Sequence, residues 1–221
     1  NNVVNVIKND TEKKYIVESN AGFLDETGMN KIYRDADSFI RPYMTVKSKY
    51  DYLTGSNGVQ SPFRYDINYR NYLIVVSGSA RVKLAPPKST KYLHPIKDYY
   101  NFEFRSPIDP WNVQEEFSND FDKIKCLDVD IYSGQLFFIP AYWWYSIEFG
   151  DNTVLASFKY DSLMSLLSTA PHYGIYFLQS HNVKRVYPSR IDEKDEERNI
   201  EDTKNRINTE KHDEPDKQNH E

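Results

Sequence analysis

The sequence predicts a mainly β protein, a sandwich or barrel of short strands with a few helices. Short apolar stretches recur along the chain between turn signals rich in Gly, Pro, Ser and Asn, and little of the sequence before residue 160 has a helical pattern. Phe, Tyr and Trp make up 15% of the 221 residues, which favours strands and supplies a large core. Short strands separated by turns are typical of β-sandwiches and barrels.

The first part of the chain gives weak signals. Residues 1–20 alternate between apolar and polar residues around a charged turn, which predicts an edge hairpin. Residues 37–50 are ambiguous, because Pro42 argues against a helix interior. Residues 54–62 are rich in Gly, Ser and Asn and predict a loop.

The central part predicts a series of strands. Residues 69–76 and 80–85 flank Gly78, and two strands around a glycine-centred turn predict a hairpin. The irregular stretch 88–125 is either a functional loop or an insertion that packs on its own aromatic residues. The remaining strands are expected at 126–131, at 136–139, from the Trp pair 143–144 onward, and at 153–160.

The C-terminal part is predicted to be helical and then charged. Residues 162–167 and 173–179 have helical patterns, and Pro188 ends the ordered part. We divide the chain into an N-terminal cover (1–53), a barrel core (54–161) with an insertion (88–125), a helical segment (162–188) and a tail (189–221).

The excess negative charge lies in this tail. Residues 189–221 contain 12 Asp or Glu and 7 Lys or Arg, a net charge of −5, whereas the preceding residues contain 21 of each sign. The body therefore has no basic excess of the kind that binds nucleic acid. We expect the tail to be disordered, or helical only on binding.

Composition also limits the compartment. No run approaches 18 apolar residues, which predicts no membrane span in this chain. The single cysteine, Cys126, excludes an internal disulfide framework and favours an intracellular or virion-associated protein, with Cys126 itself a core residue. There is no signal-peptide pattern, but the chain begins at Asn1 without Met, so an upstream segment stays open. Heavy use of Asn, Lys, Tyr, Asp and Ile suggests an AT-rich genome, such as that of a large DNA virus or a protist.

Two motifs carry a resemblance to a known family. The first is Gly-Val-Gln-Ser-Pro-Phe-Arg-Tyr-Asp at 58–66, continued by Gly-Ser-Ala-Arg-Val-Lys-Leu-Ala-Pro-Pro at 78–87. The second is Gly-Gln-Leu-Phe-Phe-Ile-Pro-Ala-Tyr-Trp-Trp-Tyr at 134–145. In order and spacing they resemble the metal-site strands of JmjC-type, cupin-like 2-oxoglutarate oxygenases, most closely the asparaginyl hydroxylase branch. The resemblance covers roughly residues 54–160 and implies a double-stranded β-helix, the jelly-roll barrel of the cupins, with a few peripheral helices.

The same resemblance shows which iron ligands are missing. The family holds Fe(II) through two histidines and a carboxylate. Its His-x-Asp motif places two ligands on one face of a strand. Here the motif reads Arg64-Tyr65-Asp66, and Tyr145 stands in place of the histidine after the Trp pair. The resemblance therefore implies a former metal site at Arg64, Asp66 and Tyr145, with no metal bound.

The positions for the cosubstrate are also altered. The family lysine that holds 2-oxoglutarate would lie at Ala80, and the resemblance places Ser61 and Ser157 in the same former pocket. We expect no cofactor; Fe(II) and 2-oxoglutarate are the alternative. Lys83 and Lys159 could bind an organic acid from barrel strands, although solvent-facing strand lysines are more common. His94, His172 and His181 are outside the expected ligand positions.

Electrostatics argues against a metal beside Arg64. A permanently charged guanidinium about 4 Å from a divalent cation would cost roughly 8 kcal/mol at an effective dielectric constant near 20. We expect the Arg64 guanidinium to occupy the iron position, paired with Asp66 and with the Tyr145 hydroxyl, so that removal of Asp66 destabilises the fold. The alternative is that Arg64 turns outward and aromatic residues fill the pocket.

Three functional hypotheses follow. The leading one is a non-catalytic relative of the hydroxylases, retained as a binding or structural module with a protein partner or through self-association. The second is an active 2-oxoglutarate-dependent hydroxylase with non-standard ligands. The third is a self-assembling or virion-associated jelly-roll protein.

Overall fold

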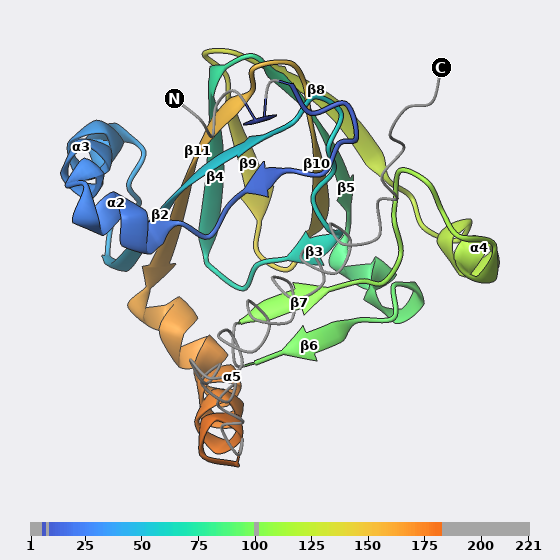
Figure 1. The fold of residues 1–221 in the computed structure, drawn as a ribbon. Coiled ribbons are helices and arrows are strands. Elements are labelled where there is room, and N and C mark those ends of the chain that lie inside the picture. The colour runs from blue at the N-terminus through green and yellow to red at the C-terminus, as the bar shows by residue number, and fades with distance from the viewer. Residues whose placement is uncertain (1–5, 8, 100–101, 183–221) are drawn as a thin grey trace, which may run out of the picture. The chain divides into compact units, whose positions relative to one another are not determined.

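The computed structural model describes residues 6–7, 9–99 and 102–182, which form two antiparallel β-sheets that face each other (Figure 1). The charged tail at 189–221 and the end of the predicted helical segment at 183–188 lie outside the described residues. The mainly β, jelly-roll fold class is confirmed.

The first sheet has five strands in the order β1-β2-β11-β4-β9. These strands are Ile16–Val17 (β1), Thr45–Gly55 (β2), Val154–Ser162 (β11), Arg70–Ser77 (β4) and Leu136–Pro140 (β9). The second sheet has six strands in the order β6-β7-β3-β10-β5-β8. They are Ile96–Asp98 (β6), Glu103–Arg105 (β7), Arg64–Tyr65 (β3), Trp144–Phe149 (β10), Ser79–Ala85 (β5) and Leu127–Tyr132 (β8).

The barrel core lies between the two sheets. Side chains that alternate along each strand point inward and form one apolar cluster of buried residues. The central members are Leu53, Leu73, Val75, Val82, Ile147 and Leu155. The cluster therefore draws its side chains from strands of both sheets.

Helices cover the outer face of the first sheet. They are α2 (Ala21–Glu26), α3 (Met29–Ala36) and the 3-10 turn η1 (Asp37–Phe39). The sequence did not predict these helices, because the two α-helices are short and have no side-chain N-cap. Asp37, the first residue of η1, is fully buried and accepts hydrogen bonds from the hydroxyls of Tyr50 and Tyr160, each at 2.8 Å, and from Arg41. Burial and the Asp37 carboxylate both raise the pKa of Tyr160, which keeps this phenol a donor.

The insertion at 88–125 packs on its own aromatic residues over the outer face of the second sheet. It contains β6, β7, the 3-10 turns η2 (Pro87–Tyr92) and η3 (Glu115–Phe117), and α4 (Ser118–Phe121). Trp144 is fully buried beneath it and donates from Nε1 to the Thr90 hydroxyl at 2.9 Å. Cys126 packs at the edge of this cluster, and burial raises the pKa of its thiol.

A long helix follows the last strand. It is α5 (Leu163–Asn182), which includes the predicted helical stretches 163–167 and 173–179, whereas Ser162 is the last residue of β11. Its His172 and Tyr173 pack on aromatic residues of the insertion. None of the described helices has the length and apolar character needed to cross a membrane.

The predicted hairpin around Gly78 is wrong. β4 pairs with β11 and β9, whereas β5 pairs with β10 and β8, so the chain crosses from one sheet to the other at Gly78. Both edges of each strand are already occupied, which leaves no edge for a β4–β5 pair. Gly78 has φ +73°, and a Cβ there would lie 2.6 Å from the Asp151 carbonyl oxygen.

Substituting Gly78 by alanine should therefore destabilise the protein by about 2 kcal/mol, because a left-handed residue and a backbone clash add together. Gly134→Ala is the matched control: its φ is +85°, but nothing lies within 4 Å of the added Cβ. Its expected cost is about 1 kcal/mol. Denaturant unfolding compares the two; equal losses would show that the close approach at Gly78 is relieved by a small shift.

The predicted N-terminal hairpin is also wrong for the described residues; positions 1–5 and 8 of the predicted stretch lie outside them. Val6 and Ile7 are helical in the described residues, and β1 pairs with β2, with Ile16 opposite Gly55. β2 itself extends into the region expected to be a loop. The physical reason is that the C-terminal end of β2 has an open edge, with which the two residues of β1 pair.

Candidate functional site

The expected site begins on two neighbouring strands of the second sheet. β3 pairs with β10 in a register that places Arg64 opposite Tyr145 and Tyr65 opposite Trp144. Because side chains alternate along a strand, Arg64 and Tyr145 point into the barrel while Tyr65 and Trp144 point into the outer cluster. Asp66 follows β3 on the inner side, so the structure brings Arg64, Asp66 and Tyr145 together.

Asp66 has two donors, and they come from opposite sheets. The Tyr145 hydroxyl donates to Oδ2 of Asp66 at 2.8 Å. The Lys159 ammonium, from β11, lies 2.7 Å from the same oxygen. The side chains of Lys159 and Asp66 are only 20% and 17% exposed, so this ion pair is largely removed from solvent. Lys159 therefore faces the interior, contrary to the solvent-facing interpretation.

Arg64 pairs with a different carboxylate from the one expected. Its Nη1 and Nη2 donate to Oε1 and Oε2 of Glu18 at 2.8 and 2.5 Å, a bidentate pair. The predicted Arg64–Asp66 pair is wrong, because the Lys159 ammonium already occupies Asp66 and the Glu18 carboxylate matches the guanidinium fork. The guanidinium carbon lies 5.6 Å from the centre of the Tyr145 ring, so the phenol offers Arg64 its face.

The alternative in which Arg64 turns outward is wrong as well. The Arg64 side chain is 15% exposed and lines a polar cavity of about 80 Å³ between the sheets. The lining also includes Glu18, Asp66, Tyr145, Ser157 and Lys159. The rim includes Lys49 and Asp51 of β2 and residues 102–104 of the insertion. The insertion therefore reaches the edge of this cavity.

The three expected cosubstrate positions separate in space. Ser157 lines the cavity, but neither Ser61 nor Ala80 belongs to its lining. The Ser61 hydroxyl oxygen accepts the Ile147 amide at 2.9 Å, and Ala80 is buried in the barrel core. Lys83 points outward, where it lies 4.9 Å from the centre of the Trp111 ring and 3.4 Å from Asp128.

Asp66 and Lys159 each stabilise the charged form of the other. Burial alone would raise the pKa of Asp66, but Lys159, with a smaller contribution from Arg64, holds it below its ordinary value. Burial would likewise lower the pKa of Lys159, but the Asp66 carboxylate raises it above its ordinary value. Two carboxylates thus balance two cations in the cavity, counting Glu18 with Arg64.

Burial and neighbouring charges also shift the pKa values of Glu18 and Tyr145. Burial raises the pKa of Glu18, but the hydrogen bonds and charge of Arg64 lower it further, so the net shift is downward. Burial and the neighbouring Asp66 carboxylate raise the pKa of Tyr145. The phenol therefore stays protonated at neutral pH and acts as a hydrogen-bond donor.

These residues do not fit a ferrous ion. Iron sites of this kind need two neutral imidazoles and a carboxylate with open coordination positions. Here one carboxylate is already bonded to an ammonium and a phenol, and a guanidinium lies next to them. In the part of the chain that the structure describes, no three His, Cys, Asp or Glu side chains lie together in a metal-binding group.

The histidines considered as substitutes are elsewhere. Nε2 of His94 lies 3.0 Å from Asp120 near α4, and the His172 ring stacks on Tyr99. The side chain of His181 lies outside the described residues. Neither of the two described histidines lines the polar cavity.

Sequence reasoning missed Glu18 and misjudged the direction of Lys159, which it considered as a barrel-strand lysine able to bind an organic acid. Lys159 had a signal: it alternates with Phe158 and Tyr160, so it had to face the opposite side of the strand from two large aromatics. Glu18 had none, because it lies just beyond a two-residue strand and 46 positions from Arg64.

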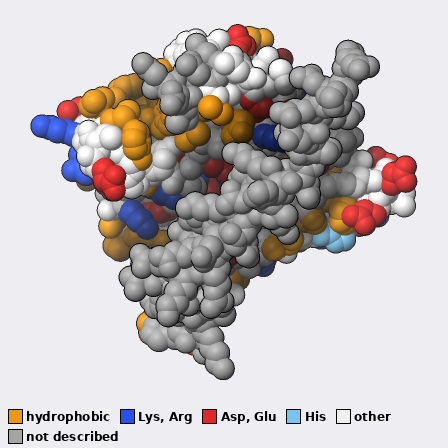
Figure 2. Space-filling view, in the orientation of Figure 1, with side chains coloured by type: hydrophobic (Ala, Val, Ile, Leu, Met, Phe, Trp, Pro, Cys, Tyr) orange, Lys and Arg blue, Asp and Glu red, His pale blue; other side chains and the backbone are white. Residues whose placement is uncertain are grey.

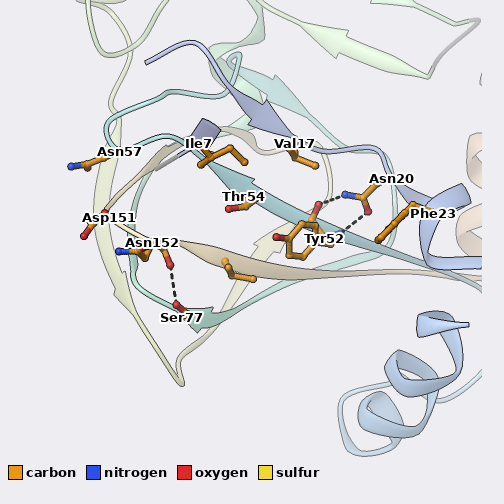
Figure 3. A pocket seen from close by; sticks show the side chains of 12 residues that line it. Ile7, Val17, Asn20, Phe23, Tyr52, Thr54, Asn57, Ser77, Asp151 and Asn152 are labelled. Atoms are coloured by element: carbon orange, nitrogen blue, oxygen red, sulfur yellow. Dashed lines mark hydrogen bonds between the residues drawn. The ribbon is translucent and has the colours of Figure 1, made fainter. Parts of the chain in front are cut away.

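A larger pocket lies away from these residues, on the outer face of the first sheet (Figure 3). Its volume is about 500 Å³, and its walls are mostly apolar, with Val17, Phe23 and Tyr52 among them. Several of its polar groups are already bonded within the chain: Asn20 to the Tyr52 backbone, and Ser77 to the Asn152 carbonyl. Figure 2 shows hydrophobic side chains gathered on this part of the molecule, next to α2 and α3. Its lining offers no cluster of titratable groups, so we place the candidate site at the polar cavity.

Comparison with curated proteins finds partial similarity. HSPB1-associated protein 1 from Mus musculus and from Homo sapiens are each 30% identical to this chain over 95 residues. The match covers 42% of this chain and 20% of either relative, so the chain corresponds to about one fifth of their length.

Two solved structures are also similar. The coconut allergen cocosin has a TM-score of 0.33 and 14% identity, covering 52% of this chain and 22% of its own. A cupin superfamily protein from Desulfitobacterium hafniense has a TM-score of 0.33 and 6% identity, covering 69% and 84%. At these scores the likeness adds nothing to the sheet topology above.

A family model gives the decisive match. The model described as "Cupin-like domain" matches residues 8–165, well over half of the chain and including every residue of the polar cavity. The match agrees with the two motifs at 58–87 and 134–145 and with the two facing antiparallel sheets. The chain belongs to the family of cupin-like domains.

Proposed function

We propose that this cupin-like domain does not catalyse Fe(II)- and 2-oxoglutarate-dependent hydroxylation and serves as a binding or structural module. One observation carries the proposal: Asp66, the carboxylate that remains of the expected ligand set, is bonded to the Lys159 ammonium at 2.7 Å and to the Tyr145 hydroxyl at 2.8 Å. The Lys159 ammonium thus already contacts the carboxylate oxygen that a metal ion would need as a ligand.

Electrostatics supports this reading. A divalent ion bound to Asp66 would have to displace the Lys159 ammonium. It would then lie close to two positive charges, the Arg64 guanidinium and the displaced ammonium. Two unit charges about 4 Å apart attract or repel each other by roughly 4 kcal/mol at an effective dielectric constant of 20. The Glu18 carboxylate cannot offset this repulsion, because it is already held by both terminal nitrogens of Arg64.

The size of the cavity supports the loss of a cosubstrate. Small-molecule sites usually have volumes of about 300–1,000 Å³. The cavity beside Asp66 has about 80 Å³, enough for a few water molecules. Ala80, in place of the family lysine, is buried in the apolar core and offers no charge to a carboxylate ligand.

Two observations support a role in protein association. The curated relatives are named for association with another protein, HSPB1, and this chain matches about one fifth of their length. With no basic excess in residues 1–188, association with protein is a better fit than binding to nucleic acid.

The direct test is turnover. The 221-residue chain is incubated anaerobically with Fe(II), exposed to oxygen and 2-oxoglutarate, and assayed for succinate and bound iron. We expect substoichiometric iron and no succinate above a no-protein control. Stoichiometric iron with succinate release would instead support the active enzyme with non-standard ligands.

Reverting the site should restore metal binding in two steps. The double variant Arg64→His, Tyr145→His supplies both missing imidazoles but keeps Lys159 on Asp66, so we expect weak or no binding of Mn²⁺. Adding Lys159→Met frees the carboxylate, and we expect stoichiometric Mn²⁺ binding by titration calorimetry. Tight binding by the double variant would mean that Lys159 does not exclude the metal.

A further inference from the structure

The apolar pocket shown in Figure 3 has a floor made by the first sheet. One row of paired residues crosses four neighbouring strands on this floor. The row consists of Val17 of β1, Thr54 of β2, Val154 of β11 and Ser77 of β4. Neighbouring strands lie about 4.8 Å apart, so the floor extends over about 14 Å.

The polar side chains of the floor are already bonded within the chain. The Thr54 hydroxyl donates to the Thr153 carbonyl at 2.7 Å. The Ser77 hydroxyl and the Asn20 amide are bonded to backbone groups (Figure 3). A ligand on this floor therefore meets mainly methyl groups and aromatic rings, and burial of its own apolar atoms would drive binding.

One end of the pocket is aromatic. Phe23 of α2 and Tyr52 of β2 lie there side by side (Figure 3). The Phe23 side chain is 56% exposed, although a phenylalanine ring gains much from leaving water. The α2 helix thus presents to the pocket an apolar surface that the fold itself does not bury.

The other end of the pocket is polar. Figure 3 shows Asn57, Asp151 and Asn152 grouped there, away from Phe23 and Tyr52. All three are exposed, and among the described residues their side chains have no hydrogen-bond or ion-pair partner. Of the lining residues within the described part of the chain, none is Lys or Arg. The Asp151 carboxylate is therefore the one charge that this lining offers to a ligand.

The polar end matches a protonated amine. A primary ammonium has three N–H donors and no acceptor, and the Asp151 carboxylate and the side-chain carbonyls of Asn57 and Asn152 are all acceptors. A ligand carboxylate would instead be repelled by the charge of Asp151. A neutral head group would gain no charge interaction there.

We propose that this pocket binds a small amphiphilic amine, with its alkyl or aryl body on the floor and its ammonium at Asp151. The volume of about 500 Å³ lies within the usual range of small-molecule sites, about 300–1,000 Å³. The proposal does not depend on the loss of hydroxylase activity, because the pocket and the polar cavity lie on opposite faces of the first sheet.

The first test uses three eight-carbon probes that differ only in their head group: octylamine, octanol and octanoate. Calorimetric titration of the 221-residue chain at pH 7 should give one-to-one binding of octylamine. A hydrogen bond to a charged group is worth more than a neutral one, so octanol should bind about tenfold more weakly. Octanoate should bind more weakly than octanol, because Asp151 repels it.

Asp151→Asn separates the charge of the pocket from its shape. The amide has the size of the carboxylate but no charge, so the variant should lose the preference for octylamine over octanol and keep its affinity for octanol. Asp122→Asn is the matched control, because Asp122 is also exposed and lies directly after α4, outside the lining. It changes the net charge equally and should keep the preference.

Phe23→Ala tests the aromatic end. Because the ring is more than half exposed, the substitution should leave thermal unfolding nearly unchanged. It removes apolar contact from both probes, so the affinities for octylamine and octanol should fall together by about fivefold. Phe39→Ala is the control: this ring of η1 is 81% exposed and lies outside the lining, so both affinities should stay the same.

Three results would overturn the proposal. One is the lack of saturable octylamine binding up to the solubility limit of the probe. Another is octanoate binding as tight as that of octylamine, which would assign the pocket to organic acids. The third is octylamine binding that Asp151→Asn and Phe23→Ala both leave unchanged although each variant unfolds at the temperature of the parent.

Discussion

Lys159→Met is expected to lower the free energy of unfolding by about 3–5 kcal/mol at pH 7, because it leaves the Asp66 carboxylate in the barrel without its cation. The ion pair is 2.7 Å long, and the two side chains are only 20% and 17% exposed. Tyr145 would remain as a donor to Asp66, but a neutral phenol does not balance the charge. Urea denaturation of the purified proteins gives the difference.

Lys83→Met is the matched control. The Lys83 side chain is 17% exposed, close to the value for Lys159, but its partner Asp128 is 35% exposed and lies 3.4 Å away on the outer face. Surface pairs of this kind contribute about 0–1 kcal/mol. Equal losses from the two substitutions would contradict a special role for Lys159.

The loss at Lys159 should depend on pH. Because the pKa of Asp66 is lowered in the folded parent, its stabilisation is present above the ordinary carboxyl pKa and is lost as the pH falls through the folded value. Burial raises the pKa of Asp66, and the Lys159→Met variant lacks the ammonium that most strongly opposes this rise. Asp66 should therefore take up a proton at a higher pH in the variant than in the parent. The difference between parent and variant should therefore shrink as the pH falls from 7 towards about 4. A difference that grows on acidification would contradict the ion pair.

Glu18→Gln is expected to cost about 3 kcal/mol, the second largest effect, because it leaves the Arg64 guanidinium buried beside a neutral amide. The bidentate bonds at 2.8 and 2.5 Å would be reduced to one acceptor. The pKa of Glu18 is lowered in the fold, so this stabilisation is present above the ordinary Glu value and is lost as the pH falls through the folded value. Thermal unfolding at several pH values measures it.

Glu103→Gln provides the comparison for Glu18. Glu103 pairs with Arg105 at 2.5 Å, but both side chains are more than a third exposed. We expect a change of less than about 1 kcal/mol. If the two glutamine variants unfold at the same temperature, the Arg64–Glu18 pair is not stabilising the barrel.

The fold was predictable from sequence because its signals are local. Gly78 and the prolines mark strand ends, the short strands between them predict a sandwich or barrel, and the motifs at 58–87 and 134–145 carry the resemblance that implies the jelly roll. The pairing of β4 and β5 was not predictable in the same way. A glycine turn between two apolar strands has the same sequence whether it closes a hairpin or crosses between two sheets, and the difference lies in distant strands that occupy the edges.

The site was only partly predictable. Alternation along 64–66 places Arg64 and Asp66 on one face, and the resemblance brings in Tyr145. The direction of Lys159 was misjudged because strand lysines more commonly face solvent, whereas both faces of β11 are covered: Phe158 and Tyr160 pack beneath the α2 and α3 helices, and Lys159 points into the barrel. Glu18 could not be predicted, because its partner is determined only by the folded chain.

We propose that internal cations hold the position of the expected iron site, and an anaerobic calorimetric titration of the 221-residue chain with Fe(II) tests this proposal most directly. The Arg64→His, Tyr145→His, Lys159→Met variant serves as the comparison in the same buffer. We predict no saturable heat for the parent and a one-to-one isotherm for the variant. One-to-one binding of Fe(II) by the parent, abolished by Asp66→Asn, would contradict the claim.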